Sequence, residues 1–131
     1  MSGAETTDAD VRAWSLVSGL GRVGFGIAML TAPEWALRAL GFSEVSPATV
    51  AVTRLAGGRD LVLGLVTMAA LDDRDRLRGA TLANTVADAG DTLAFSIALG
   101  TEERAAGSRG LAAAVPAALA GVWTAWRLSR A

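Results

Sequence analysis

Apolar residues gather in four long segments of the chain, which are separated by short polar connections. The segments are residues 11–31, 47–71, 79–99 and 110–128. Alanine and leucine dominate them, and apolar and polar positions do not alternate, so helices are favoured over strands. Each segment is long enough to cross a bilayer as a helix, because one span needs about 20 residues. We therefore predict an all-α fold with four long helices.

The connections between these segments are short and polar. The first, residues 32–46, is expected to hold one turn of interfacial helix, with Pro33 at its start and Gly41 at its end. The second, residues 72–79, is interpreted as a solvated charged turn. Pro116 is expected to kink the fourth helix. These connections predict one domain over residues 1–131, with antiparallel up-and-down helices.

The second and third segments carry their charges on one side only. On a helical wheel, Arg54, Arg59 and Asp60 share one arc of the second segment, and an entirely apolar arc lies elsewhere on the same wheel. The third segment places its polar side chains on one stripe: Asn84, Asp88 and Asp91. A soluble bundle would turn these arcs towards water, whereas a membrane bundle would turn them inward.

The first and fourth segments favour the membrane. The fourth has no charged residue from Gly110 to Trp126, and the first has only Arg22 between Ser15 and Ala32. A soluble bundle of this size needs a polar face on every helix, and two of these helices lack one. We therefore predict an integral membrane four-helix bundle.

Arginines and tryptophans predict its orientation. With a cytoplasmic N-terminus, six arginines lie on the inner side and three on the outer side, as the positive-inside rule requires. The inner group is Arg12, Arg74, Arg76, Arg78, Arg127 and Arg130, and the outer group is Arg38, Arg104 and Arg109. Tryptophans fall near both boundaries, as in an aromatic belt. We predict a location in the cell (inner) membrane with both termini cytoplasmic.

The amino-acid composition excludes several kinds of catalytic and metal-binding chemistry. The chain has no Cys, His, Lys or Tyr, which excludes thiolate and imidazole metal sites, disulfides, histidine acid–base chemistry and Schiff bases. Carboxylates are the groups that remain for proton transfer. The net charge of −1 gives no basic surface for nucleic acid. No glycine-rich phosphate loop is present, so we expect neither a metal nor a cofactor.

Charged residues from three segments are expected to meet in one layer. The rise per residue places Arg22, Asp60 and Asp91 at about 16–17 Å from the inner boundary, near the middle of a bilayer core. Arg59 lies at nearly the same level and Asp88 one turn closer to the cytoplasm. Mutual pairing is the usual way to avoid the cost of a charge buried in hydrocarbon. Glycines flank these charges and would allow close helix packing or leave room for a ligand.

Roles follow from this layer. The candidate catalytic residues are Asp60, Asp88, Asp91 and Arg59, and the candidate substrate-binding residues are Arg22, Arg54 and Asn84. Three acids facing two arginines leave one acid without a full partner, and that acid is expected to keep its proton. A protonated carboxyl beside ionised ones is what a general acid needs.

The run RLAGGRDLVLG, residues 54–64, followed by a helix with two aspartates, resembles a bacterial family of small four-span membrane proteins of unknown function. The motif is R-x-x-G-G-R-D-x-x-x-G, and the resemblance extends from about Gly21 to Trp126. It implies a four-helix membrane fold and no particular activity.

Three functions fit these features. We predict a metal-free acid–base enzyme that isomerises, cyclises or opens an epoxide of a lipophilic small molecule. The alternatives are a proton-coupled carrier or lipophile-binding protein, and a structural accessory subunit in which the charges only fix the packing. Four short helices are few for a monomeric carrier, so that alternative needs a homo-oligomer. The expected partners are the lipid bilayer and the lipophilic molecule.

Overall fold

The computed structural model of the chain describes residues 3–130 and is all-α within them. Its five helices are α1 (Gly3–Thr31), α2 (Pro33–Leu40), α3 (Pro47–Ala69), α4 (Arg74–Ala98) and α5 (Arg104–Ser129), and this part of the chain contains no strand. The four long helices correspond to the four predicted segments, and α2 is the predicted short helix. The outermost residues of the predicted domain, 1–2 and 131, lie outside the described residues.

Local signals explain several helix ends. Pro33 begins α2, and Gly41 ends it in a left-handed conformation with φ of 95°, which glycine adopts without strain. Ser46 and Thr49 form a reciprocal capping box at the start of α3. Pro116 lies inside α5, and the helix continues past it to Ser129.

The predicted charged turn at 72–79 is wrong in its extent. Helix α4 begins at Arg74, so most of that stretch is helical. Asp73 is the reason, because its side chain accepts a hydrogen bond from the backbone N–H of Arg76 at 2.9 Å and caps the helix. The arginines and leucine that follow are good helix formers. Helix α5 also begins earlier than predicted, at Arg104.

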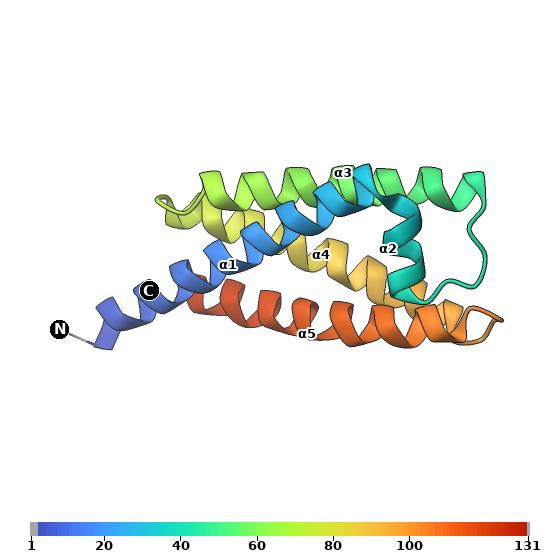
Figure 1. Cartoon of the computed structure of the whole chain (residues 1–131). Helices are drawn as coiled ribbons and strands as arrows, with labels where there is room; N and C mark the ends of the chain where they lie inside the picture. Colours follow the sequence, from blue (N-terminus) through green and yellow to red (C-terminus); the bar gives the residue numbers. More distant parts are fainter. Residues whose placement is uncertain (1–2, 131) are drawn as a thin grey trace.

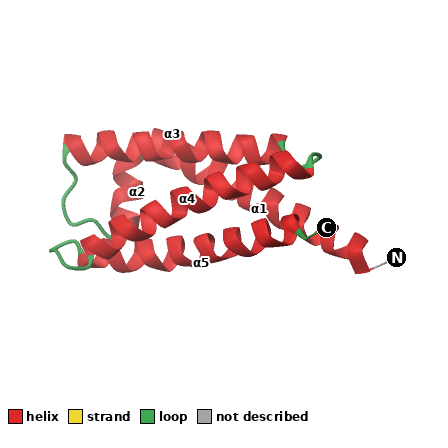
Figure 2. Cartoon of the chain, turned by 180° about the vertical axis from the view of Figure 1, so that it is seen from behind, coloured by secondary structure: helices red, strands yellow, loops and turns green. Residues whose placement is uncertain are grey.

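The long helices form two close antiparallel pairs, α1 with α3 and α4 with α5, and the two pairs meet more loosely. Figure 1 places both chain ends and the α3–α4 turn at one end of the molecule, and α2 with the α4–α5 loop at the other. The same arrangement is seen from behind in Figure 2. Gly26 lies against Gly57 so closely that an added Cβ would be 2.7 Å from the Gly57 carbonyl oxygen. These two glycines therefore allow α1 and α3 to pack closely.

Large apolar side chains lie mainly on the outside of this bundle. Leu55 is 75% exposed and Val86 is 73% exposed, whereas Asp60 and Asp88 are each 6% exposed. A cluster of buried apolar residues lies near the chain ends: Val11, Ala70, Leu77, Ala80 and Leu128. Asp60 and Asp88 face the interior, as the wheels predicted for a membrane bundle.

Two helices are long and apolar enough to cross a membrane, in the segments Ala9–Thr31 and Arg104–Ser129. Our prediction named four such spans. Helices α3 and α4 do not meet the same criterion among the described residues, because both carry more charge and polar side chains in their middle.

Candidate functional site

Five charged side chains from three helices form one continuous network in the middle of the bundle. They are Arg22 of α1, Arg59 and Asp60 of α3, and Asp88 and Asp91 of α4. We call this set the charge network. Its members alternate in sign from Asp88 through Arg22, Asp60 and Arg59 to Asp91.

Arg22 joins the two helix pairs. One terminal nitrogen, Nη2, donates to both oxygens of Asp88 at 2.5 and 2.6 Å. The other, Nη1, donates to Oδ1 of Asp60 at 3.3 Å. Arg22 therefore connects α1 to α3 and to α4 through charge-assisted hydrogen bonds, which are the stronger class.

Arg59 makes the second connection. Its Nη1 and Nη2 donate to the two oxygens of Asp91 at 2.8 and 2.7 Å, in the parallel two-bond geometry that arginine favours with carboxylates. Its Nε and Nη2 also donate to Oδ1 of Asp60 at 3.1 and 3.0 Å. Arg59 therefore shows the pairing that we expect for charges of one layer.

Burial varies along the network. The side chains of Arg22, Asp60 and Asp88 retain 12%, 8% and 9% exposure. Those of Arg59 and Asp91 retain 36% and 32%. Asp60 is the one acid held by both arginines. Each of the other two faces a single arginine, and the network as a whole has three acids for two guanidinium groups.

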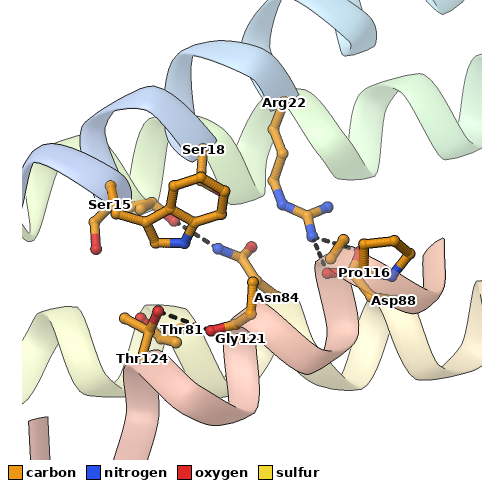
Figure 3. Close-up of a pocket in the computed structure, with 13 residues that line it drawn as sticks. Ser15, Ser18, Arg22, Thr81, Asn84, Asp88, Pro116, Gly121 and Thr124 are labelled. Carbon is orange, nitrogen blue, oxygen red and sulfur yellow. Dashed lines mark hydrogen bonds and ion pairs between the residues drawn. The ribbon is translucent and has the colours of Figure 1, made fainter. Parts of the chain in front are cut away.

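Two cavities adjoin the network between the helix pairs. The first, about 390 Å³, is lined by all five network residues and by apolar side chains that include Phe25, Met29, Leu40 and Phe95. We call it the charged cavity. The second, about 280 Å³, is lined by hydroxyl side chains together with Asn84, Arg22 and Asp88 (Figure 3). Its hydroxyl residues are Ser15, Ser18, Thr67, Thr81 and Thr124, and we call it the hydroxyl cavity.

The structure separates two of the predicted site residues from the network. Asn84 lies in the hydroxyl cavity, where its Nδ2 donates to Oγ1 of Thr67 at 2.9 Å. Arg54 lines neither of these cavities; it is exposed and donates to the Leu30 carbonyl at 3.4 Å. Five residues along a helix turn the side chain by about 140°, so Arg54 cannot share the direction of Arg59.

Sequence reasoning missed the hydroxyl side chains of α1 and α5. Ser15, Ser18 and Thr124 line the hydroxyl cavity, yet each stands alone among apolar neighbours in the sequence. Thr81 was visible, since it shares the stripe of Asn84 on the wheel. Phe25 and Phe95 form the aromatic wall of the charged cavity and could not be recognised from the sequence. An isolated phenylalanine in an apolar segment looks the same as a packing residue.

Fold and site together define an all-α protein with a paired charge network inside and apolar side chains outside. The chain belongs to the family described as a domain of unknown function, DUF4267, whose model matches residues 19–128. The matched range contains the whole charge network. No curated protein and no solved structure matches the chain. The family assignment agrees with the predicted resemblance to a family of unknown function, and it supplies no activity.

Proposed function

We propose that all four long helices span the cell (inner) membrane. Helices α1 and α5 contain apolar segments of sufficient length. Helices α3 and α4 turn large apolar residues outward, such as Leu55 and Leu93, which are 75% and 65% exposed. Soluble monomers rarely expose apolar patches of this extent, and lipid would cover this one. The charges of α3 and α4 that line the charged cavity are paired inside, which reduces the cost of placing them at bilayer depth.

The proposed orientation has both chain ends in the cytoplasm. The predicted inner arginines lie at the end of the bundle that carries both chain ends and the α3–α4 turn (Figure 1). Arg127 stacks over Trp123 at 5.1 Å, and Arg130 over Trp126 at 4.0 Å. Such cation–aromatic pairs at a helix end suit a membrane–water boundary.

We infer that the charged cavity is the active site of an acid–base enzyme for a lipophilic small molecule. The observation that carries this proposal is an apolar cavity of about 390 Å³ with three acids and two arginines in its wall. Cavities of this size, mostly apolar with a few convergent polar groups, are typical of small-molecule sites.

The hydrogen bonds of the charge network indicate different catalytic roles for its three acids. Asp60 accepts from both Arg22 and Arg59, so it is the acid of the network with the most cationic partners. The transferable proton then belongs to Asp88 or Asp91, each of which has one arginine. In epoxide opening, the protonated acid gives its proton to the epoxide oxygen as the C–O bond breaks. Water forms the new C–O bond and loses a proton to the second carboxylate. Arg59 stabilises the charge that develops.

Isomerisation or cyclisation would use the same two acids. One protonates an alkene or carbonyl group of the bound molecule, and the other removes a proton from a neighbouring carbon. Isomerisation and cyclisation both need only the two acids and the bound molecule.

The test compares matched Asp→Asn variants in lipid nanodiscs. The probes are a long-chain terminal epoxide, a β,γ-unsaturated ketone and a linear polyene, with products followed by mass spectrometry. Wild type and Asp72→Asn, in the exposed α3–α4 turn, should convert at least one probe. Asp88→Asn or Asp91→Asn should lose about 100-fold or more of that turnover, because asparagine cannot transfer the proton. Full turnover in both variants would contradict the assignment.

One observation favours a second candidate, a proton-coupled carrier. The two cavities share Ser18, Arg22 and Asp88, so the Arg22–Asp88 pair stands between them. The hydroxyl cavity extends towards the chain ends at Trp14, and the charged cavity towards α2 at Leu40. A path from one side to the other through a protonatable acid is what a carrier needs. Acidification of proteoliposomes that is lost in Asp88→Asn would support it over the enzyme.

A further inference from the structure

The hydroxyl cavity contains a buried acceptor without a partner. Asn84 is 7% exposed, and its Oδ1 accepts no hydrogen bond within the described part of the chain. Buried side-chain polar atoms are rarely left unpaired in folded proteins. We therefore expect this oxygen to accept a hydrogen bond from a molecule outside the chain. Figure 3 shows the amide of Asn84 at the side of the cavity, near Arg22 and Asp88.

The hydrogen-bond pattern establishes which atom of the amide is left without a partner. The Thr67 hydroxyl donates its proton to the Leu63 carbonyl at 2.8 Å. Its oxygen can therefore only accept from Asn84, so the amide nitrogen must be the atom that contacts Thr67 at 2.9 Å. The oxygen is then the amide atom left without a partner, and the opposite amide orientation would lose the bond to Thr67.

Two threonines of the cavity wall add further acceptors. Thr81 and Thr124 each donate their hydroxyl proton to a backbone carbonyl of their own helix, at 2.8 Å, and so offer only oxygen lone pairs to the cavity. Arg22 and Asp88 line the same cavity as an ion pair, so their charges offset each other and favour neither a cationic nor an anionic ligand. The remaining wall is apolar and includes Pro116 and Ala120.

We propose that the hydroxyl cavity is a binding site for a neutral small molecule with a hydroxyl group, whose O–H donates to Oδ1 of Asn84. The alkyl part of that molecule lies along the α5 wall at Pro116 and Ala120. The volume of about 280 Å³ accommodates such a ligand, because a cavity of about 150 Å³ already holds benzene. This site adjoins the charged cavity, with which it shares Ser18, Arg22 and Asp88. The proposed hydrogen bond at Asn84 does not depend on the proposed catalysis.

The chain offers a single reporter for the test. Asn84 is the only asparagine and there is no glutamine, so the ¹⁵N spectrum of the full chain has one side-chain carboxamide pair. Two isomeric probes, hexan-1-ol and methyl pentyl ether, are titrated separately into the protein in nanodiscs. Hexan-1-ol should shift this pair in a saturable manner. The ether lacks the donor and should bind roughly tenfold more weakly, as loss of one hydrogen bond to a buried acceptor implies.

Variants on α5 test the position of the ligand. Ala120→Leu places a larger side chain into the wall of the hydroxyl cavity and should abolish the response to hexan-1-ol. Ala112→Leu, an exposed position that lines neither cavity, should leave it unchanged. Equal shifts from alcohol and ether would overturn the proposal, as would a response that persists in Ala120→Leu. The absence of any shift with hexan-1-ol would show that water alone fills the site, which also overturns it.

Discussion

Arg22 connects the two helix pairs through ion pairs to Asp60 and Asp88. Its guanidinium lies between Asp60 and Asp88, whose side chains are 8% and 9% exposed. Removing it would leave the Asp88 carboxylate without this partner at a buried position. Breaking one side of a buried ion pair is usually much more costly than replacing both sides with apolar residues.

We expect Arg22→Met to lower the free energy of unfolding by roughly 3–5 kcal/mol. The double variant Arg22→Met with Asp88→Leu should recover much of that loss, because it leaves no unpaired charge at that position. Arg54→Met is the control, since Arg54 is exposed, and its effect should stay within about 0.5 kcal/mol. Denaturant titration in detergent measures all three. Equal effects of Arg22→Met and Arg54→Met would contradict the role of Arg22.

Glu103 illustrates a residue effect outside the helices. It precedes α5, and its two carboxylate oxygens accept from the hydroxyl and the backbone N–H of Ser43 at 2.7 and 2.9 Å. These hydrogen bonds lower the pKa of Glu103 below its usual value, with the hydroxyl contributing most. They also hold the α2–α3 connection against the α4–α5 loop.

The lowered pKa sets the direction of a pH effect. The contact is fully present above the ordinary pKa of glutamate and is lost as the pH falls through the lowered pKa of Glu103. We expect a carboxyl ¹³C titration to give a pKa for Glu103 below the ordinary value of glutamate, and Ser43→Ala to raise it towards that value. A Glu103 pKa that does not change in Ser43→Ala would show that the contact does not persist in solution.

At the scale of the helices, glycine determines how the pairs form. Gly26 and Gly57 of α1 and α3 are in backbone contact, and Gly19 and Gly64 repeat the contact one heptad away. Spacing of seven residues keeps both contacts on one side of each helix. In α5, Gly107 lies equally close to the backbone of α4 near Leu99. Close packing of small residues is a main source of helix association where no hydrophobic effect operates.

Gly26→Ala should destabilise the α1–α3 pair. The new Cβ would lie 2.7 Å from the Gly57 oxygen and from the Leu61 nitrogen, and these backbone atoms can move only if the helices separate. We expect a loss of about 1–3 kcal/mol, as for other overpacked positions. Gly24→Ala on the same helix meets nothing within 4 Å and should be neutral or stabilising by up to about 1 kcal/mol. The two variants are compared by thermal melting in the same detergent. Identical melting temperatures would contradict this account of the α1–α3 pair.

At the scale of the whole molecule, the middle of the bundle is inverted relative to a soluble bundle, whereas the end near the chain termini has a buried apolar cluster. Buried positions in the middle hold Asp60, Asp88 and Asn84, while the surface carries valine, leucine and isoleucine. In lipid this arrangement is favourable, because the apolar exterior matches the acyl chains and each charge in the network finds an opposite charge.

The proposed topology can be tested by cysteine labelling. The chain has no natural cysteine, so single variants give unambiguous labelling. Thr101→Cys, in the α4–α5 loop, should react with an impermeant maleimide in intact cells. Ser129→Cys, at the end of α5, should react only after the membrane is opened. Labelling of both positions from outside would contradict the orientation, and extraction of the protein by buffer without detergent would contradict the membrane proposal itself.

Much of the fold was predictable because it depends on local sequence. Helix type follows from the dominance of alanine and leucine, and the short helix α2 from the interval between Pro33 and Gly41. The inward direction of Asp60 and Asp88 follows from the wheel and from the cost of an exposed charge in lipid. The starts of α4 and α5 were missed because charged helix formers such as Arg74 and Arg104 extend a helix into water, where the apolar pattern gives no signal.

The sequence by itself determined which residues lie in one layer, since the helical rise fixes the depth of Arg22, Asp60 and Asp91. Only the tertiary structure decided which acid each arginine holds, that Arg54 points away, and that Asn84 faces a separate cavity. Depth is a property of one helix and can be counted along the chain. Partners depend on the rotation and closeness of several helices, which are set by contacts such as Gly26 with Gly57, far apart in sequence.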